Sequence, residues 1–206
     1  MDVVDKKEEE LIEGMEAEEE EEEGEEEGPE YDEHIWLSLK NAEKCTDAIA
    51  GRLSEIDSGN KKAYEDNATA YKTQLSTLDN EYTRITEASP TKTLLFGDRF
   101  PFRYMVDDYG LTYYAAFIGC SAASEASFAT IAFLSKIIDE LGLRYVCVIS
   151  DDHAIADSII GNTQTKDQQI VTFNSMQSIS NKEADVISYI EIMQKNLESL
   201  KTALGE

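Results

Sequence analysis

The sequence predicts an α/β fold in which a four-stranded, mainly parallel sheet is flanked by helices. After Ser89-Pro90 the apolar residues come in short runs rich in aromatic and β-branched side chains, and helical patterns alternate with these runs. Such alternation with short connections is typical of a parallel sheet covered on both faces. An unbroken apolar stripe before the sheet predicts a long spine helix that leads into it.

The chain begins with an acidic segment. Most residues between Glu8 and Glu33 are Glu or Asp, and no aromatic residue occurs before Tyr31. Such a block buries too little apolar surface to offset the entropy lost on ordering, so residues 5–30 are expected to be disordered. Two roles fit this composition: a solubilising tail or loop, or a weak collector of divalent cations, because carboxylate oxygens bind such ions.

The charge of the 206-residue chain limits its partners. A formal net charge of −25 argues against nucleic acid or an anionic membrane surface, because clustered Lys and Arg carry the affinity for both. The chain has no signal peptide and no run of about 18 apolar residues, so with Met1 as the true start it is expected to be soluble and cytoplasmic. Its cysteines lack CxxC spacing, and Cys45 and Cys147 fall in apolar patterns that predict burial.

Two helices are expected before the sheet. Residues 35–56 have near-helical apolar spacing that ends at a turn-forming Asp57-Ser58-Gly59 cluster. Next, seven apolar residues follow one another at alternating steps of four and three: Tyr64, Ala68, Tyr71, Leu75, Leu78, Tyr82 and Ile85. A coiled-coil dimer is one interpretation, but the mixed aromatic side chains favour a spine helix packed on its own chain.

The sheet is expected to consist of the runs KTLLF, LTYYAAFI, RYVCVI and QQIVTF, with helices at 100–109, 124–141, 153–162 and 185–204. In such sheets ligands bind beyond the carboxyl ends of the strands, so the loops at those ends hold the candidate site residues. These are Asp98, Arg99, Cys120, Ser121, Glu125, Asp151, Asp152, His153, Asn174 and Ser175.

The SDDH loop allows two interpretations. Asp151 or Asp152 together with His153 could bind a metal ion, or an aspartate could simply cap the next helix, and the spacing alone favours the cap. A Cys120 nucleophile with His153 as base would make an enzyme, but no other feature supports it. FGDRFPF lacks the glycines of a phosphate-binding loop, which argues against nucleotide chemistry.

Several blocks together resemble a known family. YDEHIWLSLKNA, the long helix, LLFGDRFPFRYMVDDYGLTYYAAFIGCSAASEASFATIAFL, and NSMQS followed by YIEIMQKNLESLKTAL are similar to the zinc/manganese substrate-binding proteins of bacterial ABC transporters. Within them they resemble a GDRFPFRY subgroup of the zinc-uptake type, from about Tyr31 to the end. Family members carry an acidic, often His-rich loop before the HIW element, but here that stretch has no histidine.

The resemblance implies two α/β lobes joined by one long helix, with a metal ion in the cleft between them. It divides this chain into an acidic loop or tail at 1–30, a remnant of the first lobe with the HIW element at 31–56, the linking helix at 57–90 and the C-terminal lobe at 91–206. The rest of the first lobe, with a secretion signal and a lipid-attachment cysteine, would precede Met1. The full-length family is extracytoplasmic, at the cell surface or in the periplasm.

The resemblance also implies a metal site. His34 matches the HIW histidine, a direct ligand in the family, with Trp36 behind it. Asp98 is the metal-competent choice at the family's next ligand position, where a gap could also place Gly97 or Arg99. Asp151 is nearest to the last ligand position, with Ser150, Asp152 and His153 as alternatives. The resemblance implies zinc as the bound ion, with manganese as the alternative. This set is richer in oxygen than a typical zinc site and is therefore expected to be less selective for zinc over manganese.

The expected function is that of a binding protein rather than an enzyme: it binds a divalent metal ion and delivers it to the membrane subunit of an ABC permease. The other hypothesis is a cytoplasmic, acidic α/β interaction protein without a role in metal transport, in which the strand-end residues are structural. His34 distinguishes the two, because only the metal-binding protein depends on it.

Overall fold

The structure is a computed structural model that describes residues 3–16, 30–119, 125–179 and 186–205. The chain forms η1 (Ile35–Leu37), α1 (Leu39–Ile56), η2 (Ser58–Asn60), α2 (Lys61–Ala88), β1 (Thr93–Arg99), α3 (Arg103–Asp108), β2 (Thr112–Phe117), α4 (Phe128–Leu141), β3 (Tyr145–Val148), α5 (Ala154–Asn162), β4 (Gln169–Thr172) and α7 (Tyr189–Ala203). No helix in these described ranges is both long enough and apolar enough to cross a membrane.

The four strands form one parallel sheet in the order β2-β1-β3-β4. The α/β fold and all four predicted strands are confirmed. After β2 the chain crosses to the other side of β1, so the strand order reverses between β1 and β3. Their carboxyl ends form the switch point at which such sheets usually bind ligands.

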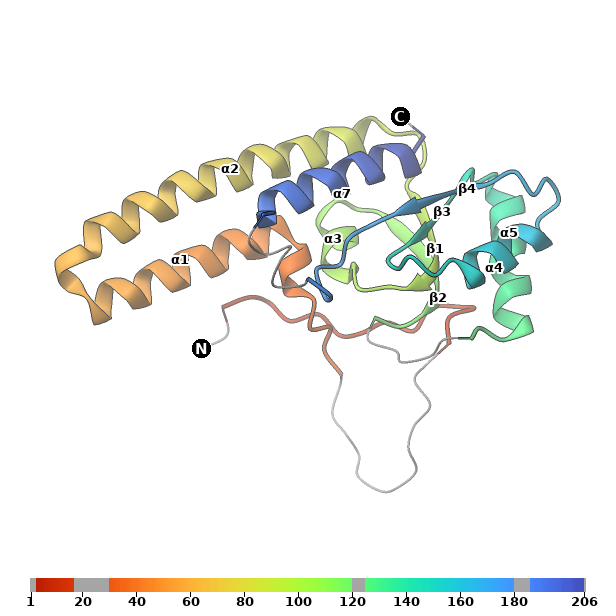
Figure 1. Cartoon of the computed structure of the whole chain (residues 1–206), viewed down its shortest axis with the longest axis horizontal. Coiled ribbons are helices and arrows are strands. Elements are labelled where there is room, and N and C mark those ends of the chain that lie inside the picture. The colour runs from red at the N-terminus through yellow and green to blue at the C-terminus, as the bar shows by residue number, and fades with distance from the viewer. Residues whose placement is uncertain (1–2, 17–29, 120–124, 180–185, 206) are drawn as a thin grey trace, which may run out of the picture.

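Helices cover both faces of the sheet (Figure 1). Successive side chains of a strand point to opposite faces, so Leu94 and Phe96 enter one apolar cluster with α2 and α7, while Leu95 enters another with α4 and α5. Gly97 of β1 allows α5 to pack closely against the sheet. A Cβ added at Gly97 would lie 2.8 Å from the Ala156 Cα atom of α5.

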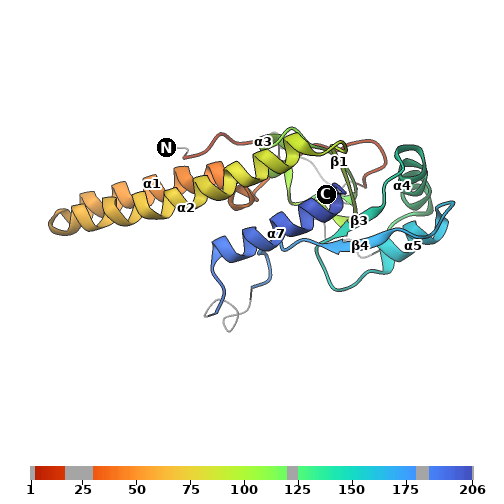
Figure 2. The same ribbon diagram turned by 90° about the horizontal axis from the view of Figure 1, so that it is seen from above.

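Helices α1 and α2 form an antiparallel hairpin that extends well past the sheet (Figures 1 and 2). The side chain of Ser38 caps α1 by accepting the Asn41 N–H at 3.0 Å. Helix α2 is the predicted spine helix. Its C-terminal half buries Leu75, Leu78, Tyr82 and Ile85 in the sheet cluster, and its N-terminal half lies along α1. It thus packs on its own chain, as the mixed stripe predicts.

Residues 3–16 differ from the expected disordered segment. They run along the lobe, with Met15 only 8% exposed and Ile12 packed on the apolar cluster. Backbone N–H groups of Glu9 and Glu16 donate to the carbonyls of Glu30 and Ala116 at 3.0 and 2.9 Å. The two apolar side chains and these bonds order a segment whose glutamates alone predicted disorder. Residues 17–29 of the expected segment lie outside the described residues.

The contact between β1 and α5 can be tested by replacing Gly97 with alanine. The added methyl group would meet the Ala156 Cα, the Ala156 Cβ and the Val146 side chain at 2.8, 2.9 and 3.0 Å. We expect Gly97→Ala to lower the free energy of unfolding by about 1–3 kcal/mol, the usual effect of overpacking. Denaturant unfolding measures it. Gly51→Ala is the matched control, because Gly51 in α1 has no heavy atom within 4 Å of the added Cβ and alanine raises helix propensity. Equal midpoints for both variants would contradict the packing.

Candidate metal centre

His34 lies at the carboxyl edge of the sheet and is fully buried. It stands just before η1, and its ring packs edge-on against Trp36, with centroids 5.2 Å apart. Trp36 is fixed at both ends: its indole N–H donates to the Ser175 carbonyl at 2.9 Å, and its own carbonyl accepts the Tyr189 hydroxyl at 2.8 Å. The histidine therefore sits on a rigid support, with Trp36 against it as the resemblance implies.

Asp32 orients the imidazole of His34. One carboxylate oxygen, Oδ1, accepts the His34 backbone N–H at 2.8 Å and lies 3.1 Å from its Nδ1 atom. Both side chains are buried, with 1% of His34 and 3% of Asp32 exposed. A carboxylate can only accept, so Nδ1 carries the proton in the neutral ring. The lone pair that binds a metal ion then belongs to Nε2.

The Nε2 atom of His34 faces Gln177, whose amide nitrogen lies 2.8 Å away. Gln177 comes from the loop after β4, which Asn196 of α7 fastens through two 2.8 Å bonds to the backbone of Asn174. The preceding residue, Met176, has φ of 60°. A non-glycine residue in this left-handed region is strained by roughly 1 kcal/mol or more and often marks a functional loop.

Gln177 was missed by sequence reasoning, which selected Asn174 and Ser175 from the same loop. The loop itself was predicted correctly, because it follows an expected strand. Only the fold shows that Gln177 reaches a histidine 143 residues earlier in the chain.

Asp98 lies at the switch point, where the register of β1 against β2 shifts between Phe96 and Arg99. It is 8% exposed. Its Oδ2 atom accepts the N–H groups of Ile149 and Ser150 at 3.0 and 3.2 Å and the Ser150 hydroxyl at 2.9 Å. Its Oδ1 accepts the Arg99 N–H at 2.8 Å. The carboxylate thus ties the end of β1 to the loop after β3, and a metal ion there would compete with these donors.

The SDDH loop is more open. Asp151 and Asp152 are exposed and His153 is partly exposed. The Asp152 carboxylate accepts the Ala154 N–H at the start of α5, at 3.1 Å, whereas the N-cap residue His153 makes no side-chain cap hydrogen bond. Across the described ranges, no three His, Cys, Asp or Glu side chains come together as a metal-binding group. His34, Asp98, Asp151 and His153 are therefore not gathered in this arrangement of the chain.

Three candidate site residues remain. Cys120 and Ser121 lie outside the described residues, and Glu125 is exposed. Of the two cysteines predicted to be buried, Cys45 in α1 is only partly buried. Cys147 is buried in β3, as predicted, and burial raises the pKa of its thiol to about 12. At neutral pH this thiol stays protonated, so it acts as a small apolar side chain.

A family model described as "Zinc-uptake complex component A periplasmic" matches residues 2–203. The chain belongs to this family. It is 33% identical over 199 residues to the "High-affinity zinc uptake system protein ZnuA" of Bacillus subtilis, covering 94% of this chain and 60% of that protein. It is 30% identical over 196 residues to the "Zinc-binding lipoprotein AdcA" of Streptococcus pneumoniae, covering 93% of this chain and 38% of the relative.

Solved structures of the zinc-uptake family have the same fold. The Zn(II)-bound ZnuA-like domain of Streptococcus pneumoniae AdcA superposes with a TM-score of 0.69 at 27% identity, covering 85% of this chain and 65% of that one. The chain thus spans less than two thirds of the length of these relatives. The suspected membership is confirmed, and the match extends further towards the N-terminus than the blocks from Tyr31 onwards.

The structural role of Asp98 can be tested with Asp98→Asn. An amide replaces one acceptor oxygen by a donor, so the part-buried N–H groups on one side of it, those of the loop after β3 or that of Arg99, lose their acceptor. We expect the free energy of unfolding to fall by about 1–3 kcal/mol. Asp151→Asn makes the same chemical change at an exposed position and should stay within about 0.5 kcal/mol of the parent. Thermal or denaturant unfolding compares the two. Asp98→Asn as stable as Asp151→Asn would exclude the tie between β1 and β3.

Proposed function

We propose that this chain is the metal-binding part of a zinc-uptake protein and that His34 is the ligand on which binding depends. One observation carries the proposal: the buried Asp32–His34 pair leaves the Nε2 lone pair directed at Gln177 in the loop after β4. A histidine that donates its other ring N–H to a carboxylate is the usual zinc-ligating arrangement, because the carboxylate fixes the tautomer and raises the basicity of the ring.

Zinc is the proposed cargo. Relatives at 30% identity or more are named for zinc, and an imidazole ligand favours zinc over manganese, in keeping with the general order of divalent metal affinities. The formal charge of −25 raises the local concentration of any divalent cation around the chain. The ligand roles expected for Asp98, Asp151 and His153 stay predictions.

We further propose that the metal passes from this site to the membrane subunit of an ABC permease, outside the cytoplasm. This step rests on the family, whose relatives are named as uptake proteins and lipoproteins. These names describe binding and transport rather than catalysis. None of the comparisons supports a cytoplasmic interaction protein.

The proposal is tested by titrating zinc into the chain in competition with a chromophoric chelator. His34→Ala should abolish one-to-one binding, because it removes the nitrogen donor. His153→Ala deletes the same chemical group at a partly exposed site and decides whether the second histidine takes part. Weak, multiple binding that is unaffected by His34→Ala would place the metal on scattered glutamates and overturn the proposal.

The role of Asp32 gives a second prediction. Asp32→Asn keeps the shape of the side chain but removes the charge that fixes the imidazole, so zinc affinity should fall about 10- to 100-fold, the usual effect of losing such a partner. Glu33→Gln is the matched control, because Glu33 is the exposed neighbour and loses the same charge. The same chelator competition measures both variants. If Asp32→Asn and Glu33→Gln had equal zinc affinities, Asp32 would contribute only its negative charge and would not orient the imidazole.

A further inference from the structure

We propose that Glu9, from the acidic segment, supplies a carboxylate to the metal ion bound at His34. This inference rests on the function proposed above and names a ligand that lies outside the loops at the strand ends. It assigns a fixed position to one glutamate of a segment whose composition suggested only a diffuse negative charge.

Gly119 lies next to both side chains. A Cβ built on this glycine would lie 3.2 Å from the Cε1 atom of His34, 3.2 Å from the Phe100 carbonyl oxygen and 3.4 Å from the Oε1 atom of Glu9. The imidazole and the carboxylate therefore both approach the backbone at this one residue, which follows the end of β2. A larger residue at this position would crowd all three groups, and glycine allows their close approach.

Backbone pairing holds Glu9 at this point. Its N–H donates to the Glu30 carbonyl at 3.0 Å, and the Asp32 N–H donates to the Lys7 carbonyl at 2.9 Å. Residues 7–9 and 30–32 thus run side by side in antiparallel fashion, with a bridge between Glu8 and Tyr31. Because His34 follows this pair by only two residues, the segment that carries Glu9 and the segment that carries His34 form one unit.

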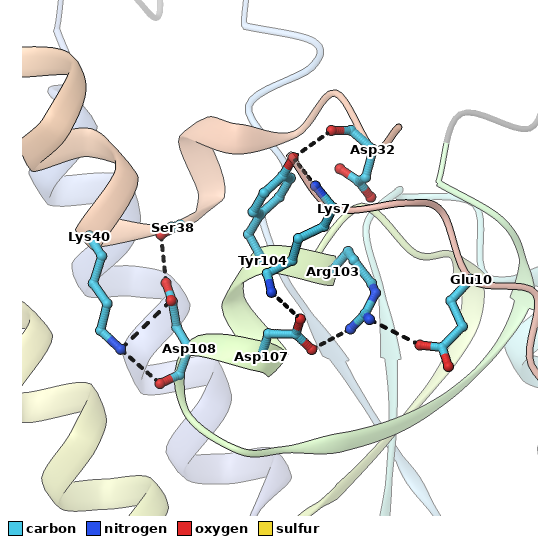
Figure 3. A network of polar contacts seen from close by, with 9 residues as sticks. All are labelled: Lys7, Glu10, Asp32, Ser38, Lys40, Arg103, Tyr104, Asp107 and Asp108. Atoms are coloured by element: carbon cyan, nitrogen blue, oxygen red, sulfur yellow. Dashed lines mark hydrogen bonds and ion pairs between the residues drawn. The ribbon is translucent and has the colours of Figure 1, made fainter. Parts of the chain in front are cut away.

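Side chains of α3 fasten the same unit from the other side (Figure 3). The buried Tyr104 hydroxyl accepts the Lys7 N–H at 3.2 Å and donates to the Asp32 carbonyl at 2.9 Å. Lys7 pairs with Asp107 at 2.6 Å, and Glu10 pairs with Arg103 at 3.1 Å. The residues on either side of Glu9 are therefore anchored to α3, while Glu9 itself reaches Gly119.

The resulting donor set suits a divalent cation. His34 offers Nε2 and Glu9 offers a carboxylate oxygen. The Gln177 amide NH2 group now faces Nε2, and a cation bound there would repel it. A flip of the amide group would then offer its oxygen as a ligand. Zinc is usually four-coordinate, so three protein ligands would leave one position open to water, as in zinc sites that are not closed by a fourth side chain.

The test is zinc affinity of the full chain, measured by chelator competition for Glu9→Gln, Glu9→Asp, Glu8→Gln and Glu13→Gln. The two control glutamines remove the same charge from exposed residues of the same segment. We expect Glu9→Gln to weaken zinc binding at least about tenfold and the controls to change it much less. Glu9→Asp keeps the charge but draws the oxygens back, so it should also weaken binding. Cobalt(II) as a spectroscopic probe should show a changed visible spectrum only in the two Glu9 variants.

Two outcomes would overturn the inference, and His34→Ala separates them. If His34→Ala abolishes binding while Glu9→Gln matches the Glu8 and Glu13 controls, the metal is held at His34 without Glu9, and the proposed function stands. If His34→Ala also leaves binding unchanged, both the inference and the proposed function fail.

Discussion

The buried pair of Asp32 and His34 is the contact on which the arrangement of the site depends. Through its backbone Asp32 pairs with Lys7 and accepts the Tyr104 hydroxyl, so it joins the N-terminal segment to α3. Through its carboxylate it fixes the ring of His34, whose other nitrogen meets Gln177 from the loop after β4. Three parts of the chain that are distant in sequence are thus aligned around one imidazole. A buried polar group left unpaired costs about 1–3 kcal/mol, so each of these bonds favours the same single arrangement.

The carboxyl ends of the strands carry different polar groups, and these groups relate to His34 in different ways. At β1 and β3 the carboxylate of Asp98 is taken up by backbone N–H groups, which makes the switch point rigid rather than open. After β2, Gly119 allows the His34 ring and the Glu9 carboxylate to approach the backbone closely, and after β4 a strained turn places Gln177. The strand ends therefore differ: Asp98 is held by backbone N–H groups, whereas Gln177 contacts the imidazole.

The sequence was sufficient for elements whose signal is local. The four strands and the long helix followed from apolar periodicity, while His34 was selected by the family resemblance and its role as a ligand stays a prediction. What it could not supply depends on contacts between distant residues. Asp98 was correctly placed at a strand end, but its donors come 51 and 52 residues later. The order of residues 3–16 was missed because a count of glutamates hides Ile12 and Met15, which pack on the apolar cluster. Gln177 was missed because only the fold brings it to His34.

The acidic segment shows why the position of a charge matters more than the number of charges. At a separation of 4 Å two unit charges interact by about 1 kcal/mol in bulk water and by about 4 kcal/mol at the effective dielectric near a protein surface. Salt screens the interaction between fully exposed charges, with a screening length of about 8 Å at physiological ionic strength. A glutamate in a freely moving tail also loses conformational entropy each time it meets an ion. The backbone of Glu9 is already held by its pairing with Glu30, so it avoids the backbone part of that loss. Among the carboxylates near the N-terminus, we therefore expect Glu9 to give the proposed zinc site the largest gain in affinity.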